Sequence, residues 1–102
     1  MNSVKMTVVR IYLMGANHPM KVIRDYLKEE AKVIGLTIFR AVDGFGLHGQ
    51  SHASWVDLSL EGPLVIEFMD QDDKVHAAMA HVSQWVKPEH MLWWSVHANR
   101  GL

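Results

Sequence analysis

The chain has 102 residues, with ten basic and eleven acidic side chains, a formal net charge of −1, seven histidines and no cysteine. This length predicts a single domain spanning residues 1–102, and the absence of cysteine excludes disulfides, thiolate metal sites and thiol nucleophiles. The balanced charge argues against nucleic-acid binding, and no apolar run reaches the roughly 18 residues of a membrane span. Because no signal-peptide pattern is visible and cysteine is absent, we expect a cytoplasmic protein.

The first half of the chain predicts a strand, a helix and a second strand. Val4–Leu13 is rich in β-branched residues and is typical of a strand. Its alternation places Thr7, Val9, Ile11 and Leu13 on one face and Met6, Val8, Arg10 and Tyr12 on the other. Apolar residues recur at helical spacing over 19–34, with a proline suited to the first helical position. Gly35 is expected to end this helix as a left-handed cap, and Leu36–Asp43 predicts the second strand.

The second half predicts a strand, a helix and a final strand after a long connection. Leu64–Met69 predicts the third strand. The acidic segment 70–73 suits the positive end of a second helix, which Lys87-Pro88 should end. The apolar face of this helix comprises Val75, Ala78, Met79, Val82 and Val86. The last strand begins at His90 or Met91 and runs to Ala98.

The element order βαββαβ predicts an α+β, ferredoxin-like fold, in which a four-stranded antiparallel sheet carries two helices on one face. The other face should be polar in a monomer. Trp93 and Trp94 point to opposite faces, however, so one tryptophan lies on the uncovered face in either orientation. An apolar second face predicts a homo-oligomer whose sheets pack together. Arg10, Arg40 and Glu67 interrupt this face and should be paired there, Arg40 with Glu67 of the adjacent strand.

Residues 44–62 form a long connection that begins with three glycines, Gly44, Gly46 and Gly49. Glycine permits positive φ and close approach of the backbone to another chain or a ligand. Long ordered connections in small domains are commonly functional. We therefore interpret 44–62 as the functional loop.

Several short motifs stand in a defined order along the chain. They are Ile11-Tyr12-Leu13, Gly44-Phe45-Gly46, the spaced histidines His48 and His52, the segment Leu58-Ser59-Leu60-Glu61-Gly62-Pro63, and Leu64-Val65-Ile66-Glu67 followed by Asp70. With the element order βαββαβ, this combination resembles the PII signalling superfamily and is most similar to its uncharacterised PII-like branch. The resemblance covers nearly the whole chain.

The resemblance implies a homotrimer with inward-facing sheets and ligand clefts between neighbouring subunits. It implies a non-enzymatic regulatory protein that holds an adenine nucleotide at the loop base and reports occupancy to a protein partner through the loop. The ligand-binding residues implied are Gly44, Phe45 and Gly46, which would line the cleft, Gln50, which would meet phosphate, and Arg100, which would act as a tail arginine.

One departure from the PII pattern concerns the connection before the last strand. PII proteins have a second glycine-rich loop with a lysine there, whereas this chain has Lys87-Pro88-Glu89-His90. A cradle of backbone N–H groups for a triphosphate is therefore missing. The departure favours AMP or ADP over ATP, and a different small anion or no nucleotide remains an alternative.

Two functions of other classes remain as alternatives. His48 and His52 could bind a metal, which would make the protein similar to the CutA trimers that share this architecture. The loop could instead dock on a partner with no small ligand, as in an adaptor. The acidic residues Asp70, Asp72 and Asp73 are interpreted as helix-capping groups rather than a cation site, and His76 and His81 as solvated. No nucleophile context is visible, so we expect no enzymatic activity.

Overall fold

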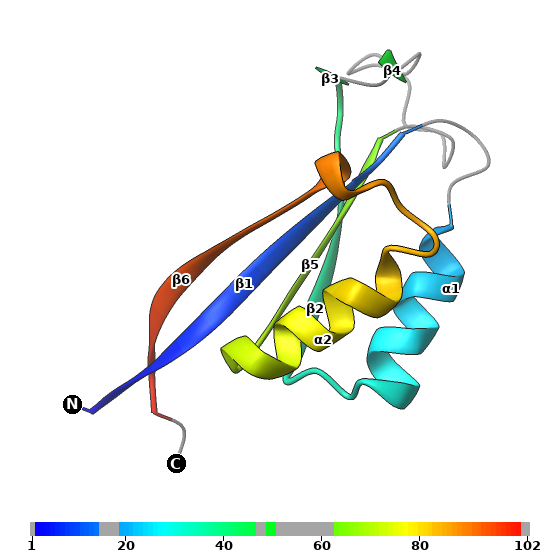
Figure 1. Ribbon diagram of the computed structural model, residues 1–102. Helices are drawn as coiled ribbons and strands as arrows, with labels where there is room; N and C mark the ends of the chain where they lie inside the picture. Colours follow the sequence, from blue (N-terminus) through cyan, green and yellow to red (C-terminus); the bar gives the residue numbers. More distant parts are fainter. Residues whose placement is uncertain (1, 15–18, 47–48, 51–62, 101–102) are drawn as a thin grey trace.

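The computed structural model describes residues 2–14, 19–46, 49–50 and 63–100. Four strands form one antiparallel sheet in the order β2-β5-β1-β6, and the helices lie together on one face of it (Figure 1). The element order confirms the predicted ferredoxin-like fold. The elements are β1 (Ser3–Leu13), α1 (Met20–Asp25), the π-helical turn η1 (Tyr26–Glu30), β2 (Gly35–Arg40), β3 (Phe45–Gly46), β4 (Gly49–Gln50), β5 (Leu64–Asp70), α2 (Asp72–Val82), the 3₁₀ turn η2 (Pro88–His90) and β6 (Met91–Asn99).

The core lies between the helices and the sheet face that they cover. The register places Val9 opposite Phe68 and Ile11 opposite Ile66, so these apolar side chains share that face. The buried cluster comprises Val9, Ile11, Leu13, Leu64, Ile66, Phe68 and Met91 from the sheet, Ile23, Leu27, Val75, Ala78 and Val82 from the helices, and Val86 after α2. The alternation predicted for the first strand is therefore confirmed.

The first helical segment ends earlier than the sequence predicts. Its α-helical part stops at Asp25 and continues as a π-helical turn to Glu30. Lys32, with a φ of 53°, takes the left-handed conformation expected at Gly35, and Gly35 opens β2. Ile34, the last apolar residue of the predicted helical spacing over 19–34, is 66% exposed. Its N–H donates to the Asp70 carboxylate at 3.0 Å, a long-range bond that no helical pattern reveals.

Helix α2 also differs from the expectation at both ends. Gln71 is its N-cap and makes no side-chain capping bond, whereas the acidic first turn is formed by Asp72 and Asp73. The helix ends at Val82 rather than at Lys87-Pro88, and a non-helical turn follows in which Val86 remains buried. The predicted acidic N-terminus is thus present, in favourable orientation to the helix dipole. Asp73 accepts the first-turn N–H of Lys74, and Asp72 accepts the Thr7 hydroxyl.

An aromatic cluster joins the two helices. The His81 ring stacks on Tyr26, with the centroids 4.0 Å apart and the planes 9° from parallel, and Trp85 contacts both rings edge-on. On the first turns of α2, His76 meets Trp93 of β6 edge-on at 5.5 Å. Both histidines are exposed, as expected, but the ring of each packs against an aromatic neighbour.

Tyr26 is expected to make the fold sensitive to alkaline pH. Burial, followed by the negative charge of Glu30, raises the pKa of the Tyr26 phenol above its usual value of 10.0. A raised folded-state pKa gives stability that is complete below the unfolded pKa and is lost as pH rises through the folded pKa. We expect the midpoint of urea unfolding to decrease as the pH rises above about 10. The decrease should be smaller in Tyr26→Phe than in the wild type. Equal declines in the two proteins would contradict this.

Candidate functional site

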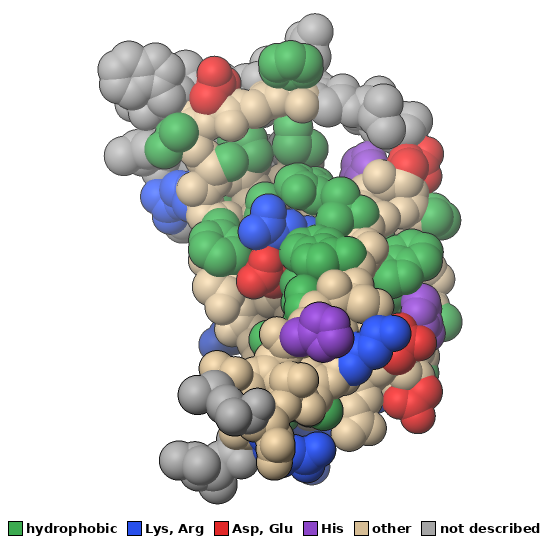
Figure 2. Space-filling view, turned by 90° about the vertical axis from the view of Figure 1, so that its left-hand side faces the viewer, with side chains coloured by type: hydrophobic (Ala, Val, Ile, Leu, Met, Phe, Trp, Pro, Cys, Tyr) green, Lys and Arg blue, Asp and Glu red, His purple; other side chains and the backbone are tan. Residues whose placement is uncertain are grey.

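The sheet face opposite the helices is largely apolar. Figure 2 shows it, with hydrophobic side chains gathered around a basic and an acidic group. The residues that share this face by register are Met6, Val8, Arg10 and Tyr12 of β1, Thr37 and Phe39 of β2, Val65, Glu67 and Met69 of β5, and Leu92, Trp94 and Val96 of β6. We call this set the open face. Trp94 lies on it and is 38% exposed, whereas Trp93, on the helix side, is 51% exposed.

Arg10 stands at the centre of the open face and is paired within the chain. Its Nε lies 2.8 Å from Glu67 Oε1, and its guanidinium carbon lies 5.6 Å from the Trp94 ring centroid and 6.0 Å from that of Phe39. The hydrogen bond to Glu67, followed by one to Tyr12, raises the pKa of Arg10. The face therefore carries an ion pair between aromatic rings, an arrangement suited to burial because a paired charge costs less to cover than a single one.

The ion pair differs from the one predicted. The register places Thr37 opposite Glu67, and Arg40 opposite Leu64 on the helix side of the sheet. Residues directly opposite share a face, so Arg40 and Glu67 point away from each other and the predicted Arg40–Glu67 pair is wrong. The ion-pair partner of Glu67 is instead Arg10 of β1.

The base of the glycine loop forms a tight hairpin. β3 pairs with β4, so that Phe45 lies opposite Gln50 and Gly46 opposite Gly49. The Phe45 side chain is 91% exposed. Gly44 precedes the hairpin and donates its N–H to the Asp43 carboxylate at 2.9 Å, and a Cβ placed on Gly44 would meet nothing within 4 Å. Within the single chain, packing therefore does not require glycine at position 44.

Arg100 lies far from this hairpin. Its N–H donates to the Asn2 carbonyl at 3.0 Å, beside the end of β6. Figure 1 places the start of β1 and the end of β6 at one end of the sheet and the β3–β4 hairpin at the other. The structure thus brings Phe45 and Gln50 of the predicted ligand-binding residues together in one chain and separates Arg100 from them.

A cavity of about 210 Å³ lies at the connection between α2 and β6. Its lining comes from four segments, namely Tyr12, Leu13 and Met14 at the end of β1, Pro19 before α1, Trp85, Val86 and Lys87 after α2, and His90 of η2. This is the connection in which the sequence shows no glycine cradle. It supplies a lysine and a histidine to a cavity with aromatic walls, which sequence reasoning missed because the lining residues are scattered along the chain.

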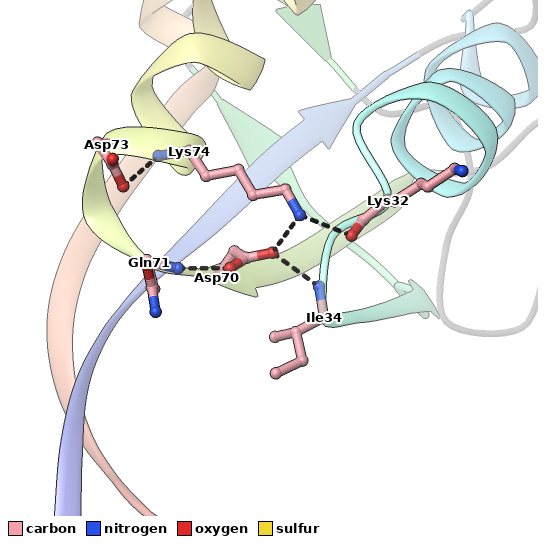
Figure 3. A network of polar contacts seen from close by, with 6 residues as sticks. All are labelled: Lys32, Ile34, Asp70, Gln71, Asp73 and Lys74. Atoms are coloured by element: carbon pink, nitrogen blue, oxygen red, sulfur yellow. Dashed lines mark hydrogen bonds and ion pairs between the residues drawn. The ribbon is translucent and has the colours of Figure 1, made fainter.

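A polar network ties the start of α2 to the turn before β2 (Figure 3). Asp70 is nearly buried and accepts hydrogen bonds from Gln71 N at 2.7 Å and Ile34 N at 3.0 Å. The Lys74 amine lies 3.2 Å from the same carboxylate and donates to the Lys32 carbonyl at 2.9 Å. Protein donors thus occupy Asp70, and it acts as a structural group.

Metal binding has no support in the part of the chain that the structure describes. In those residues, no group of three histidine, aspartate or glutamate side chains is arranged to hold an ion. Asp72 accepts a hydrogen bond from the buried Thr7 hydroxyl at 2.8 Å and lies 3.3 Å from His76 Nε2. The predicted alternative ligands His48 and His52 lie outside the described residues.

A family model matches residues 6–98, nearly the whole chain; it is DUF190, described as Uncharacterized ACR. The chain belongs to the DUF190 family. No curated protein matches the sequence. Among the described residues of this DUF190 chain, no helix is long and apolar enough to cross a membrane.

Solved structures of PII-like proteins share the fold of this chain. The nitrogen regulatory PII-like protein CPII of Thiomonas intermedia, bound to ADP and bicarbonate, aligns with a TM-score of 0.73 and 20% identity, covering 97% of this chain and 93% of its own. A putative PII-like signaling protein of Thermus thermophilus aligns at 0.69 and 17%, covering 99% and 96%. The periplasmic divalent cation tolerance protein CutA of Archaeoglobus fulgidus aligns at 0.60 and 14%, covering 95% and 87%. The predicted resemblance to PII-like proteins is therefore confirmed at the level of the fold.

Proposed function

We propose that this DUF190 chain is a PII-like regulatory protein that assembles as a homotrimer and binds AMP or ADP between subunits at the base of the 44–62 loop. The observation that carries the proposal is the apolar open face with its internal ion pair. A contiguous exposed apolar surface favours coverage by a partner, and packing of identical sheets supplies one. CPII structures that contain ADP, AMP and bicarbonate support the nucleotide part.

Assembly would also explain why the predicted ligand-binding residues are divided. Phe45 and Gln50 sit on the hairpin at one end of the sheet, and Arg100 sits at the other end. A ligand that contacts both groups requires two neighbouring subunits. In this arrangement the Phe45 ring would cover the nucleoside, and the Arg100 guanidinium would meet the phosphates, since arginine forms charge-assisted bonds with phosphate.

Nucleotide binding is tested by calorimetric titration of the protein with AMP, ADP, ATP and cyclic nucleotides, with light scattering to report the mass of the assembly. We expect AMP or ADP to bind, and Arg100→Gln to weaken that binding about tenfold to hundredfold because a charge-assisted phosphate bond is lost. Lys21→Gln, which also removes one exposed positive charge but lies on α1, is the matched control and should leave affinity unchanged.

The outcomes separate the two parts of the proposal. If the protein forms a trimer but binds none of these nucleotides, the nucleotide part of the proposal is wrong. The protein would then be an assembly whose loop acts as an adaptor. If the protein is a monomer at micromolar concentration, the assembly part of the proposal is wrong. Titration with zinc or copper forms a further arm. Metal binding that is lost in the His48→Ala, His52→Ala double variant would favour the CutA-like alternative, a protein class whose fold also matches this chain.

A further inference from the structure

A polar pocket lies on the helix side of the sheet, near the start of β1. Its volume is about 240 Å³, and it is lined by Lys5 and Thr7 of β1, Ser95 of β6 and Asp72 of α2. This volume corresponds to about eight water molecules, or one small polar molecule. Thr7 alternates with the open-face residues of β1, and Figure 1 places the start of β1 at the opposite end of the sheet from the β3–β4 hairpin. The pocket is therefore separate from both the open face and the loop base.

The pocket arises because α2 leaves the helix side of β6 uncovered. In Figure 1, α2 lies on the β5 side of β1, and β6 lies on the other side of β1. Ser95 and His97 of β6 are accordingly exposed, although they share the helix-side face with the buried Thr7. The Thr7 hydroxyl donates to Asp72 Oδ1 at 2.8 Å. Asp72 thus forms a wall above a floor of two hydroxyl-bearing strand residues.

Three polar groups of the pocket keep unused hydrogen-bonding capacity. The two contacts of Asp72, with the Thr7 hydroxyl and with His76 Nε2, both reach Oδ1, so Oδ2 has no partner among the described residues. The Lys5 amine and the Ser95 hydroxyl likewise make no hydrogen bond or ion pair in the described part of the chain. A carboxylate oxygen, an ammonium and a hydroxyl therefore remain available to a ligand.

The two charges of the pocket restrict the class of ligand. Lys5 on the strand and Asp72 on the helix do not pair with each other, which leaves room for a ligand between them. A simple anion would be attracted by Lys5 but repelled by Asp72, and a simple cation would meet the reverse. A ligand with both a carboxylate and an ammonium group satisfies both charges, and its carboxylate also accepts the Ser95 hydroxyl. Free α-amino acids carry these two groups on one carbon atom.

An aromatic surface borders the pocket. Trp93 precedes Ser95 by two residues on the same face of β6, and His76 follows Asp72 by about one helical turn. The two rings meet edge-on with their centroids 5.5 Å apart, and Trp93 is 51% exposed. An apolar side chain that leaves the pocket on this side would pack against the Trp93 ring. The border therefore favours amino acids with apolar or aromatic side chains over glycine.

We propose that this pocket binds a free L-α-amino acid with an apolar or aromatic side chain. Asp72 holds the ammonium group, Lys5 and Ser95 hold the carboxylate, and Trp93 packs against the side chain. The bound amino acid joins β6 to the first turn of α2. This site does not depend on the proposed nucleotide site, because it lies on the other side of the sheet from the open face and away from the hairpin.

The first test is calorimetric titration of the full-length protein with L-phenylalanine, L-leucine and glycine. Because Lys5 and Asp72 remain in contact with water, we expect dissociation constants of about 0.1–1 mM for phenylalanine or leucine and weaker binding of glycine. L-phenylalaninamide lacks the carboxylate and N-acetyl-L-phenylalanine lacks the ammonium, so each should bind about tenfold more weakly. Absence of binding at about 10 mM, or analogues that bind as well as phenylalanine, would overturn the proposal.

Variants then assign each charge of the ligand to its partner. Lys5→Gln should weaken phenylalanine binding about tenfold and leave phenylalaninamide binding unchanged, since that analogue has no carboxylate. Asp72→Asn, which keeps an acceptor oxygen for Thr7, should weaken phenylalanine binding by a similar factor and leave N-acetylphenylalanine binding unchanged. Asp73→Asn, on the same helical turn but outside the lining, is the matched control and should have no effect. Equal effects of the Asp72 and Asp73 variants would overturn the assignment.

Amide resonances locate the bound amino acid independently of these variants. Titration with phenylalanine should shift the amide resonances of Thr7, Asp72 and Ser95, and those of Phe45 and Gln50 on the hairpin should stay in place. Shifts confined to the hairpin would place the amino acid at the loop base and overturn the proposal. Nucleotide titration of the same sample should leave the pocket resonances unchanged, so the two proposals can fail separately.

Discussion

Replacement of Trp94 by glutamate is expected to convert the proposed trimer to a monomer. Trp94 lies on the open face opposite Val8, beside an Arg10 that already pairs with Glu67. Packing of open faces would bury the new carboxylate without a partner, at a cost of several kcal/mol per ion and per subunit contact. A cost of this size cancels most of the binding free energy of an interface of standard size. Sedimentation velocity at micromolar concentration measures the change.

The neighbouring tryptophan provides a control on the same strand. Trp93→Glu introduces the same charge one residue away, on the helix side, where Trp93 is half exposed and contacts His76. We expect this variant to keep the mass of the wild-type assembly. Identical masses for the two variants, whether both assembled or both monomeric, would contradict the assignment of the open face as the subunit contact.

Replacement of Asp70 by alanine is expected to lower the free energy of unfolding by about 2–3 kcal/mol. The change leaves the N–H groups of Ile34 and Gln71 without their acceptor and removes the anionic partner of Lys74. Urea denaturation measures the loss of stability. Hydrogen exchange should show faster exchange at Ile34 and Gly35, since the turn before β2 is no longer tied to α2.

Two variants calibrate this result. Asp70→Asn keeps one acceptor oxygen but not the charge. Its free energy of unfolding should therefore decrease by less than that of Asp70→Ala. Asp73→Ala removes a carboxylate that accepts a bond from the adjacent Lys74 N–H at an exposed position, and its stability should change by less than about 0.5 kcal/mol. An Asp70→Ala protein as stable as Asp73→Ala would show that the network in Figure 3 does not stabilise the fold.

The fold was predictable because each element carries its own periodic pattern. The apolar open face was also predictable without the strand register, since Trp93 and Trp94 must point to opposite faces in any register. The end of the first helix was not predictable. Gly35 resembles a helix cap locally, whereas the bond from Ile34 N to Asp70, 36 residues away, moves the left-handed position to Lys32.

The candidate site was predictable in part. Gly44-Phe45-Gly46 marked the loop base, but periodicity does not reveal the pairing of Phe45 with Gln50. The partner of Glu67 depends on register, which places Thr37 opposite it and leaves Arg10 as its ion-pair partner. Cavities and grooves were beyond sequence reasoning, because residues such as Tyr12 and His90 meet only after the chain has folded.

The Arg10–Glu67 pair has a consequence for how a cell would build the proposed assembly. Its two charges neutralise each other inside a single newly folded chain, so association needs no exchange of charges between copies. Encounter of two copies then gains little from long-range attraction and depends on contact between apolar surfaces. The rate of the proposed assembly would therefore depend on the concentration of chains and on temperature, and only weakly on ionic strength.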